Sequence, residues 1–376
     1  MDDPSPALKD GFADATVNAI AQRLADASPE FQRARFKKVV LDGFDELSLM
    51  ARVRRVAEGM VAALPADFAQ ALAIVERALG EPPHIDDVSE GMGAFQWAPF
   101  LEFVAIAGIA HPELALPALA RLTRHFTGEF AIRPFLEQHL DTTRDHVRSW
   151  VTHTDPRVRR LASEGTRPLL PWGKHVTLLK REPHDGLALI EALAHDSSDN
   201  VRRSAANHLN DVSRLFPDLA LQHANRWATQ SELGQATARH AMRTLIKKGH
   251  PAALGLLGYD VAAEVTLSGL TLSAKRLAIG DTLQVQATLT AAAKGKKAVR
   301  CCVDYAVRYA SARGTERLKV FKGSSLSLMP GEPVVFAFQR DFIPRTTRVL
   351  YPGEHAVQVL VNGVMLGEQG FTLGVS

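Results

Sequence analysis

The segment DPRVRRLASEGTRPLLPWG, residues 155–173, decides the fold of the first part of the chain. Asp155 followed by Pro156 predicts a helix start, because aspartate accepts hydrogen bonds from free backbone amides and proline suits the first helical position. Apolar or small residues then recur at helical spacing, which predicts one buried face. These residues are Val158, Leu161, Ala162 and Gly165.

A second copy of this segment follows in the sequence. DNVRRSAANHL begins at residue 199 and repeats the Val-Arg-Arg core, with Val158 and Val201 separated by 43 residues. That spacing falls within the roughly 40–47 residues of HEAT-type repeats. Weaker echoes occur at 237–245 and 51–59. The repeat predicts stacked helix pairs that form a solenoid, since each pair needs its neighbours to bury its apolar face.

The chain divides into two parts with different hydrophobic periods. Helical spacing dominates to about residue 256, in the segments 46–64, 66–79, 99–110 and 113–126. Period-two alternation dominates from about 263, in the segments 282–291, 298–310, 332–342 and 355–363. We therefore predict a HEAT-like α-solenoid over 1–256 and an immunoglobulin-like β-sandwich over 257–376. The break at 80–99 is long enough to be a functional or a mobile loop.

Composition narrows the class of protein. The 376 residues are 46% hydrophobic and 23% charged with a formal net charge of +3, as in ordinary globular proteins. No apolar run is long enough to span a membrane, and the acidic start does not have the layout of a signal peptide. The only cysteines, Cys301 and Cys302, are adjacent, which fits neither a disulfide framework nor a zinc site. We expect a cytoplasmic monomer that needs no metal or cofactor, and no nucleotide-binding or serine-hydrolase motif is present.

Arginines cluster on the two repeated helices. In a solenoid, equivalent helices face the same side, so these arginines predict a curved basic surface that binds the phosphates of double-stranded DNA. The alternative for the motif helix is an exposed pair between Arg160 and Glu164, four residues apart, with only a small effect on stability. The candidate phosphate ligands are Arg148, Arg157, Arg159, Arg160, Arg167, Arg202 and Arg203.

Three carboxylates interrupt this basic field: Glu129, Glu164 and Asp211. Carboxylates repel phosphate, so they serve either to pair with arginine or to take part in chemistry. Two tryptophans have a similar ambiguity between core packing and ligand contact. Trp172 lies in a loop stiffened by two prolines, and Trp97 lies in the 80–99 break.

Three motifs together resemble the AlkC branch of the HEAT-like-repeat DNA alkylation-repair glycosylases: EFAIRPFL (129–136), RRLASEGTRPLLPWG (159–173) and NVRRSAANHLND (200–211). The resemblance implies hydrolytic excision of cationic N-methylated bases, 3-methyladenine and 3-methylcytosine, from alkylated DNA without deep base flipping. It also implies catalytic roles for Glu164, Glu129 and Asp211 and a DNA contact for Trp172. Some members of the branch carry a C-terminal Ig-like domain, which matches the strand-patterned part of this chain.

The chemistry of such a reaction suits carboxylates. A methylated ring nitrogen makes the base cationic, so it leaves as a neutral molecule while positive charge develops on the sugar. Carboxylates beside the sugar stabilise that charge and position water.

The sandwich has basic residues of its own, and there are two interpretations of them. They would bind DNA, or they would be ordinary solvated charges. These residues are 295–297, Arg300, Arg308, Arg313 and Lys319.

Two further hypotheses remain open at this point. The chain could be a non-catalytic HEAT-repeat scaffold that binds a protein along its concave face. It could also be a damage-binding protein that recognises DNA and does not cut it. Release of free methylated base from alkylated DNA separates the enzyme from both.

Overall fold

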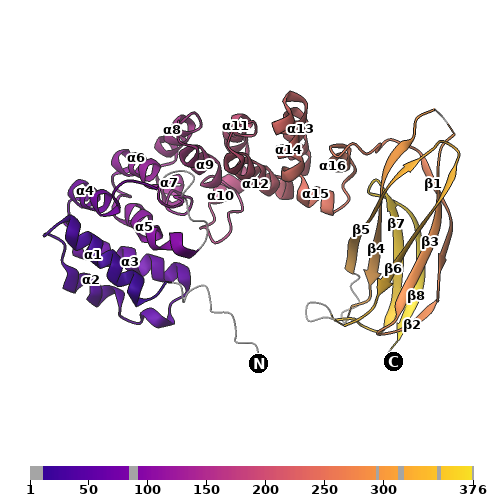
Figure 1. Ribbon diagram of the computed structural model, residues 1–376, viewed down its shortest axis with the longest axis horizontal. Coiled ribbons are helices and arrows are strands. Elements are labelled where there is room, and N and C mark those ends of the chain that lie inside the picture. The colour runs from indigo at the N-terminus through magenta and orange to yellow at the C-terminus, as the bar shows by residue number, and fades with distance from the viewer. Residues whose placement is uncertain (1–11, 84–91, 294–295, 312–316, 345–348, 375–376) are drawn as a thin grey trace. The chain divides into compact units, whose positions relative to one another are not determined.

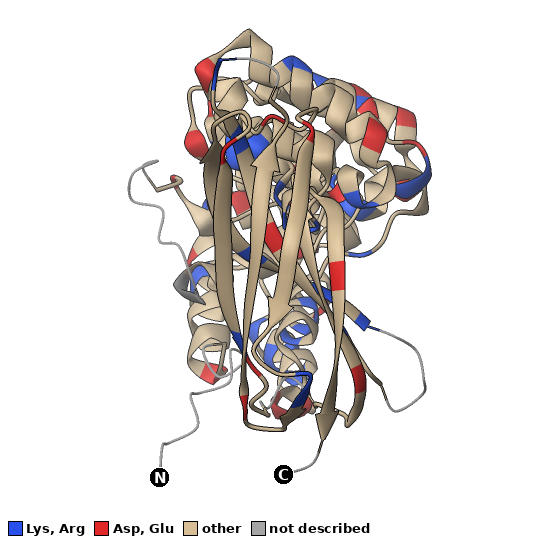
Figure 2. Cartoon of the chain, turned by 90° about the vertical axis from the view of Figure 1, so that its right-hand side faces the viewer, with Lys and Arg blue, Asp and Glu red and all other residues tan. Residues whose placement is uncertain are grey.

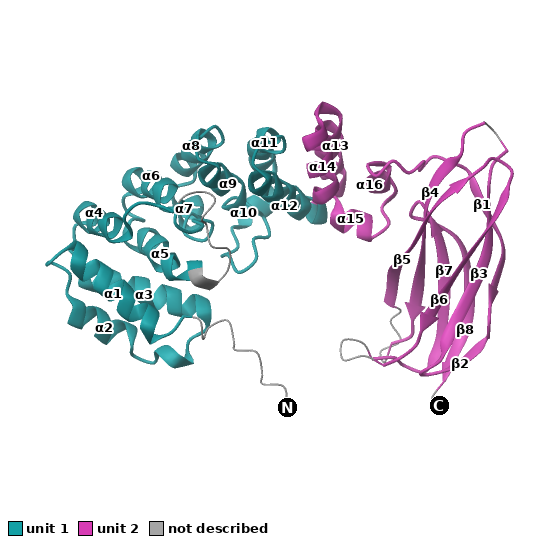
Figure 3. Cartoon of the chain, viewed as in Figure 1, with its two compact units in different colours: residues 1–215 teal, residues 216–376 magenta. Residues whose placement is uncertain are grey.

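The computed structural model describes residues 12–83, 92–293, 296–311, 317–344 and 349–374. Within these ranges a helix-rich region is followed by strands, which confirms the predicted fold class (Figure 1). The chain divides into two compact units, residues 1–215 and 216–376 (Figure 3). The last helices of the chain therefore belong to the same unit as the strands.

Unit 1 is helical throughout its described residues. The helices lie in two rows, so that α4, α6, α8 and α11 form one row and α3, α5, α9 and α12 the other (Figure 1). Within these rows α3 packs on α5, α6 on α8 and α9 on α12. The bounds are α1 Asp14–Ala27, α2 Arg33–Val40, η2 Phe44–Glu46, α3 Leu49–Ala63, α4 Phe68–Leu79, η4 Met92–Trp97, α5 Ala98–Ala107, α6 Pro112–Leu122, α7 Arg133–Gln138, α8 Leu140–Trp150, α9 Pro156–Glu164, α10 Thr177–Arg181, α11 His184–Leu193 and α12 Asp199–Leu215.

Local sequence explains where the motif helix α9 begins and which face it buries. The Asp155 carboxylate accepts a hydrogen bond from the backbone amide of Arg157 at 2.9 Å, as an N-cap does, and Pro156 takes the first position. Val158 and Leu161 are fully buried, as the helical spacing predicts. Val201, the repeat partner of Val158, is fully buried on α12. The two helices that carry the copies of the motif, α9 and α12, contact each other.

The described residues of unit 2 form helices followed by a β-sandwich. Its helices are α13 Pro217–Gln230, α14 Glu232–Ala241, α15 Arg243–Lys247 and α16 Pro251–Gly255. Its strands are β1 Val265–Leu272, β2 Arg276–Ala278, β3 Thr282–Ala291, β4 Val299–Tyr309, β5 Arg317–Leu328, β6 Pro333–Asp341, β7 Gly353–Val361 and β8 Val364–Gly374. They form one sheet in the order β1-β3-β6 and another in the order β2-β8-β7-β4-β5. Buried side chains of both sheets, such as Val285 and Val357, form the core between them.

The joint between the helices and the sandwich in unit 2 is close. A Cβ atom added at Gly363, in the β7–β8 turn, would lie 1.6 Å from the carbonyl oxygen of Gly249 before α16. The Asn362 amide donates to the carbonyl of Asp260 at 2.9 Å, and the Asp260 carboxylate accepts from the Arg300 amide at 2.7 Å. The segment between α16 and β1 is therefore fixed to the sandwich.

Candidate active site

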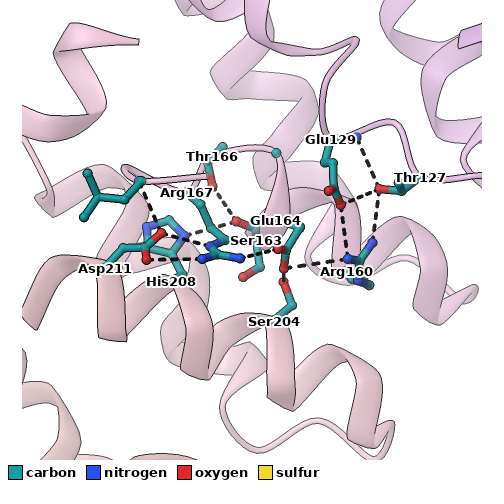
Figure 4. Close-up of polar contacts among 12 residues, drawn as sticks. Thr127, Glu129, Arg160, Ser163, Glu164, Thr166, Arg167, Ser204, His208 and Asp211 are labelled. Atoms are coloured by element: carbon teal, nitrogen blue, oxygen red, sulfur yellow. Dashed lines mark hydrogen bonds and ion pairs between the residues drawn. The ribbon is translucent and has the colours of Figure 1, made fainter. Parts of the chain in front are cut away.

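Three carboxylates and two guanidiniums alternate along a chain of contacts in unit 1 (Figure 4). Their order is Glu129, Arg160, Glu164, Arg167, Asp211. They come from the segment between α6 and α7, from α9 and the loop after it, and from α12. The structure thus brings together all three carboxylates that the sequence singled out, with two of the seven candidate arginines.

Glu129 is the most accessible of the three carboxylates, with 12% of its side chain exposed against 6% for Glu164 and 3% for Asp211. Its Oε2 atom accepts hydrogen bonds from the Thr127 hydroxyl at 2.7 Å and from Arg160 at 3.1 Å. Arg160 also donates to the Thr127 hydroxyl at 3.1 Å. Both described donors use the same carboxylate oxygen, so Oε1 of Glu129 is the oxygen that a water molecule could approach.

Glu164 occupies the last residue of α9, where the helix dipole disfavours a negative charge. Arginines compensate for that position. Arg167 donates to Oε1 at 2.5 Å, the Ser204 hydroxyl donates to Oε2 at 2.6 Å, and Arg160 lies 3.9 Å from Oε2. A carboxylate that lies at an unfavourable helix position and whose negative charge is balanced by arginines is typical of a functional site.

Asp211 holds two parts of the site together. Its two oxygens accept from Nε and Nη2 of Arg167 at 2.9 and 3.2 Å, and Oδ2 also accepts from the backbone amide of Leu169 at 3.2 Å. The bidentate geometry matches the fork of the guanidinium. Asp211 therefore anchors both Arg167 and the start of the loop that follows.

The electrostatics of the site keep Glu164 ionised. Burial by itself favours the neutral acid, but the nearby charges of Arg160 and Arg167 and the hydrogen bond from Ser204 outweigh it, so the pKa of Glu164 lies below its ordinary value. Burial likewise disfavours the charged form of Arg167, yet Asp211 and Glu164 raise its pKa. The site thus carries permanent charges of both signs.

Trp172 projects from the loop after α9. Its side chain is 65% exposed, although nearby Leu170 is buried. Its φ angle of 60° is unusual, because bulky residues avoid the left-handed region. The exposure of the indole argues against core packing, which was one of the two alternatives for Trp172.

Arg133 is a member of the site that sequence reasoning missed. It begins α7, is fully buried, and donates to the carbonyls of Gly165 and Arg167 at 3.0 Å each and to the carbonyl of Lys174. Burial lowers its pKa to about 10. The EFAIRPFL motif that contains it was the only available signal. Two hydroxyl groups that orient the carboxylates, Thr127 and Ser204, were also missed.

Two candidate phosphate ligands are occupied by contacts within unit 1. Arg157 donates to the Asp155 carboxylate at 2.7 Å and to the carbonyl of Arg124 at 2.9 Å. Arg159 donates to both oxygens of Asp196 at 2.6 and 2.8 Å. These two guanidiniums tie helices to neighbouring loops.

The remaining candidates differ in exposure. Arg202 donates to the carbonyl of Asp196 at 2.6 Å and is 16% exposed, whereas Arg203 is 66% exposed and lies 3.2 Å from Asp199. Arg148 is 59% exposed beside Asp145. Trp97 packs near Phe100, and Arg23 stacks on its ring. Residues 84–91 of the 80–99 break lie outside the described residues.

Charged residues are more frequent on the helices than on the strands (Figure 2). In the sandwich, Arg300 donates to the carbonyl of Leu257 at 3.1 Å and Arg308 pairs with Glu368 at 2.7 Å, while Lys319 lies over the ring of Phe321. Gly295 and Arg313 lie outside the described residues.

Neither a metal cluster nor a membrane span is found in the described parts of the chain. Among those residues, no group of three or more His, Cys, Asp or Glu side chains could hold a metal ion. No helix within them is both long and apolar enough to cross a bilayer.

Comparison with known proteins places this geometry in a wider context. The chain is 34% identical over 357 residues to the uncharacterized protein YhaZ of Bacillus subtilis strain 168, which covers 95% of this chain and 96% of that protein. A family model described as the C-terminal Ig-like domain of YhaZ matches residues 266–375. The solved structure of Pseudomonas fluorescens alkylpurine DNA glycosylase AlkC, bound to DNA containing an abasic site analog, is 33% identical with a TM-score of 0.80 and covers 98% of this chain and 99% of that one.

Proposed function

Because this chain belongs to the AlkC-type family of DNA alkylation-repair glycosylases, in the variant with a C-terminal Ig-like domain, we propose that it is a DNA glycosylase that binds DNA. The observation that carries the proposal is the alternation of three carboxylates with two arginines, together with the exposed Trp172 in the loop after α9. A protein-binding scaffold has no use for buried carboxylates held in that way.

We propose that the substrates are cationic N-methylated bases, 3-methyladenine and 3-methylcytosine, in double-stranded DNA. Such a base leaves as a neutral molecule, so the enzyme needs no strong general acid. The developing positive charge on the sugar requires fixed negative charge, and Glu164 supplies it because its pKa lies below the ordinary value. The exposed indole of Trp172 would stack on the sugar or on the cationic base, so that the lesion need not enter a deep pocket.

The contacts support a different role in the reaction for each of the three carboxylates. Glu129 has the greatest exposure and one oxygen free of described donors, so it positions and deprotonates the attacking water. Glu164 stabilises the oxocarbenium-like sugar electrostatically. Asp211, with both oxygens occupied by Arg167 and Leu169, holds the arginine and the loop in place. Arg160 and the exposed Arg148 and Arg203 remain the candidates for phosphate contact.

We assign residues 1–256 to HEAT-like repeats and 257–376 to the Ig-like domain. The last helix ends at Gly255 and the first strand begins at Val265, which supports a boundary between them. The division into compact units falls earlier, at 215/216, and groups α13–α16 with the strands.

The sandwich is proposed to contact DNA through Lys296 and Lys297, which are exposed. If they neutralise phosphates, the double charge reversal K296E/K297E should weaken binding to any duplex and make the dependence of affinity on salt less steep. An unchanged salt dependence would make the sandwich an accessory domain.

Release of free base tests the proposed function directly. Purified protein is incubated with duplexes that contain 3-methyladenine or 3-methylcytosine, and the released base is measured by chromatography. Release by the wild-type protein and its loss in E129Q would support the proposal. Binding to duplex DNA containing an abasic-site analogue without release of either base would identify a damage-binding protein instead.

A further inference from the structure

The loop that carries Trp172 is held at both of its ends by one buried side chain. Arg133 donates to the carbonyls of Gly165 and Arg167 on the near side of the loop and to the carbonyl of Lys174 on the far side. No part of Arg133 is exposed to solvent. A lysine could not reach three carbonyls in this way, because it has one nitrogen where the guanidinium has a rigid fork of donors.

The backbone at Trp172 requires such support. A bulky residue with a φ angle of 60° persists only where the surrounding structure determines its conformation. The indole itself is 65% exposed, so packing of the side chain does not supply that constraint. The backbone contacts of the loop must therefore hold it.

The same loop is also tied to the carboxylates. Asp211 accepts a hydrogen bond from the Leu169 amide and binds Arg167, which in turn binds Glu164. With Arg133 fixing residues on both sides, the separation between the Trp172 ring and the carboxylates is set by buried contacts rather than by the exposed loop itself.

We infer that Arg133 is a positioning residue, which holds Trp172 at a fixed place relative to Glu164 and Asp211 so that a nucleotide fits between indole and carboxylates. This inference rests on the proposed glycosylase function for its catalytic consequence, but the clamp itself is a property of the loop. Arg133 donates to backbone carbonyls and is shielded from solvent, so it does not touch the substrate itself.

The chain offers a matched control. Arg52 on α3 is also a buried arginine, 4% exposed, and donates to three backbone carbonyls, those of Leu47, Phe12 and Asp45, at 2.8–3.2 Å. The substitutions R133K and R52K therefore make the same chemical change at two clamps, of which only one holds the Trp172 loop. A general loss of stability should appear in both variants.

The first measurement is amide hydrogen exchange, which does not depend on enzymatic activity. The Leu169 amide donates to Asp211 and the Gly173 amide to the carbonyl of Leu170 at 3.3 Å, so both report on the loop. We expect exchange of these amides to accelerate at least tenfold in R133K and to stay at the wild-type rate in R52K and in W172A. Unchanged exchange in R133K, or loosening in W172A, would overturn the inference, and W172A keeps the test available if R133K does not fold.

The second measurement is a double-mutant cycle on single-turnover base release. Because small displacements of binding groups can cost about a hundredfold in rate, R133K should lower release by about ten- to a hundredfold. The double variant R133K/W172A should be no slower than W172A alone, since Arg133 acts only through the indole. Additive effects of the two substitutions would refute the positioning role, whereas R52K should retain the wild-type rate.

Discussion

Replacing Glu129 with glutamine should abolish most base release while the protein remains folded. The substitution preserves size and removes the charge of the carboxylate that has an oxygen open to water. The Arg160 contact at 3.1 Å corresponds to about 5 kcal/mol at an effective dielectric of 20. However, Arg160 is 26% exposed and keeps Glu164 at 3.9 Å, so the net loss in free energy of unfolding should be about 1 kcal/mol.

The effect of E129Q on the reaction should be much larger than its effect on stability. Removing one preorganised group that stabilises charge or activates water costs about 10²–10³-fold in rate. Single-turnover release of 3-methyladenine measures the rate, thermal unfolding measures stability, and fluorescence anisotropy with an abasic-analogue duplex measures binding. The control E76Q removes a carboxylate from another arginine pair in unit 1, that with Arg121 at 2.7 Å, and should release base normally. A wild-type rate in E129Q would mean that Glu129 only holds Arg160, and the proposed role would fail.

Three other perturbations test separate parts of the structure. W172A should leave the unfolding temperature unchanged, because the indole is exposed, and should slow base release by about tenfold through the loss of stacking. D196N should lower the urea unfolding midpoint by an amount equivalent to about 2 kcal/mol, because the Asp196 side chain is 8% exposed and accepts two hydrogen bonds from Arg159. Base release by D196N should persist. Burial lowers the pKa of His208 from 6.5 to about 4. As the pH falls, this histidine is therefore protonated in the unfolded chain before it is protonated in the folded protein. Stability should therefore decrease by about 3 kcal/mol between pH 6.5 and pH 4, and H208Q should flatten the dependence of unfolding temperature on pH; equal slopes would contradict this cause.

The elements with strong periodicity were predictable from sequence. The segment 46–64 contains α3, Leu49–Ala63, and the segment 282–291 coincides with β3. The strand β5, Arg317–Leu328, was missed because it is largely exposed at a sheet edge and contains Gly323, so no clear alternation marks it. Periodicity detects an element only when burial divides its faces.

The site was predictable only in part. Motifs pointed to Glu129, Glu164 and Asp211, and the structure brings them together through Arg160 and Arg167. Spacing along one helix could not reveal contacts between distant residues. Arg159 was read as a phosphate ligand, yet its partner Asp196 lies 37 residues away. Arg133 likewise acts on a loop 32 to 41 residues further along the chain.

The close approach of Gly249 and Gly363 limits where the chain can be truncated or fused to another protein. A side chain at Gly363 would collide with the Gly249 carbonyl, so this point of the joint admits no other residue without rearrangement. A truncation after residue 256 would remove Gly363 and with it the close contact to Gly249, just before α16. The transferable module therefore starts at Phe216, and a graft of the sandwich onto another helical array should carry α13–α16 with it.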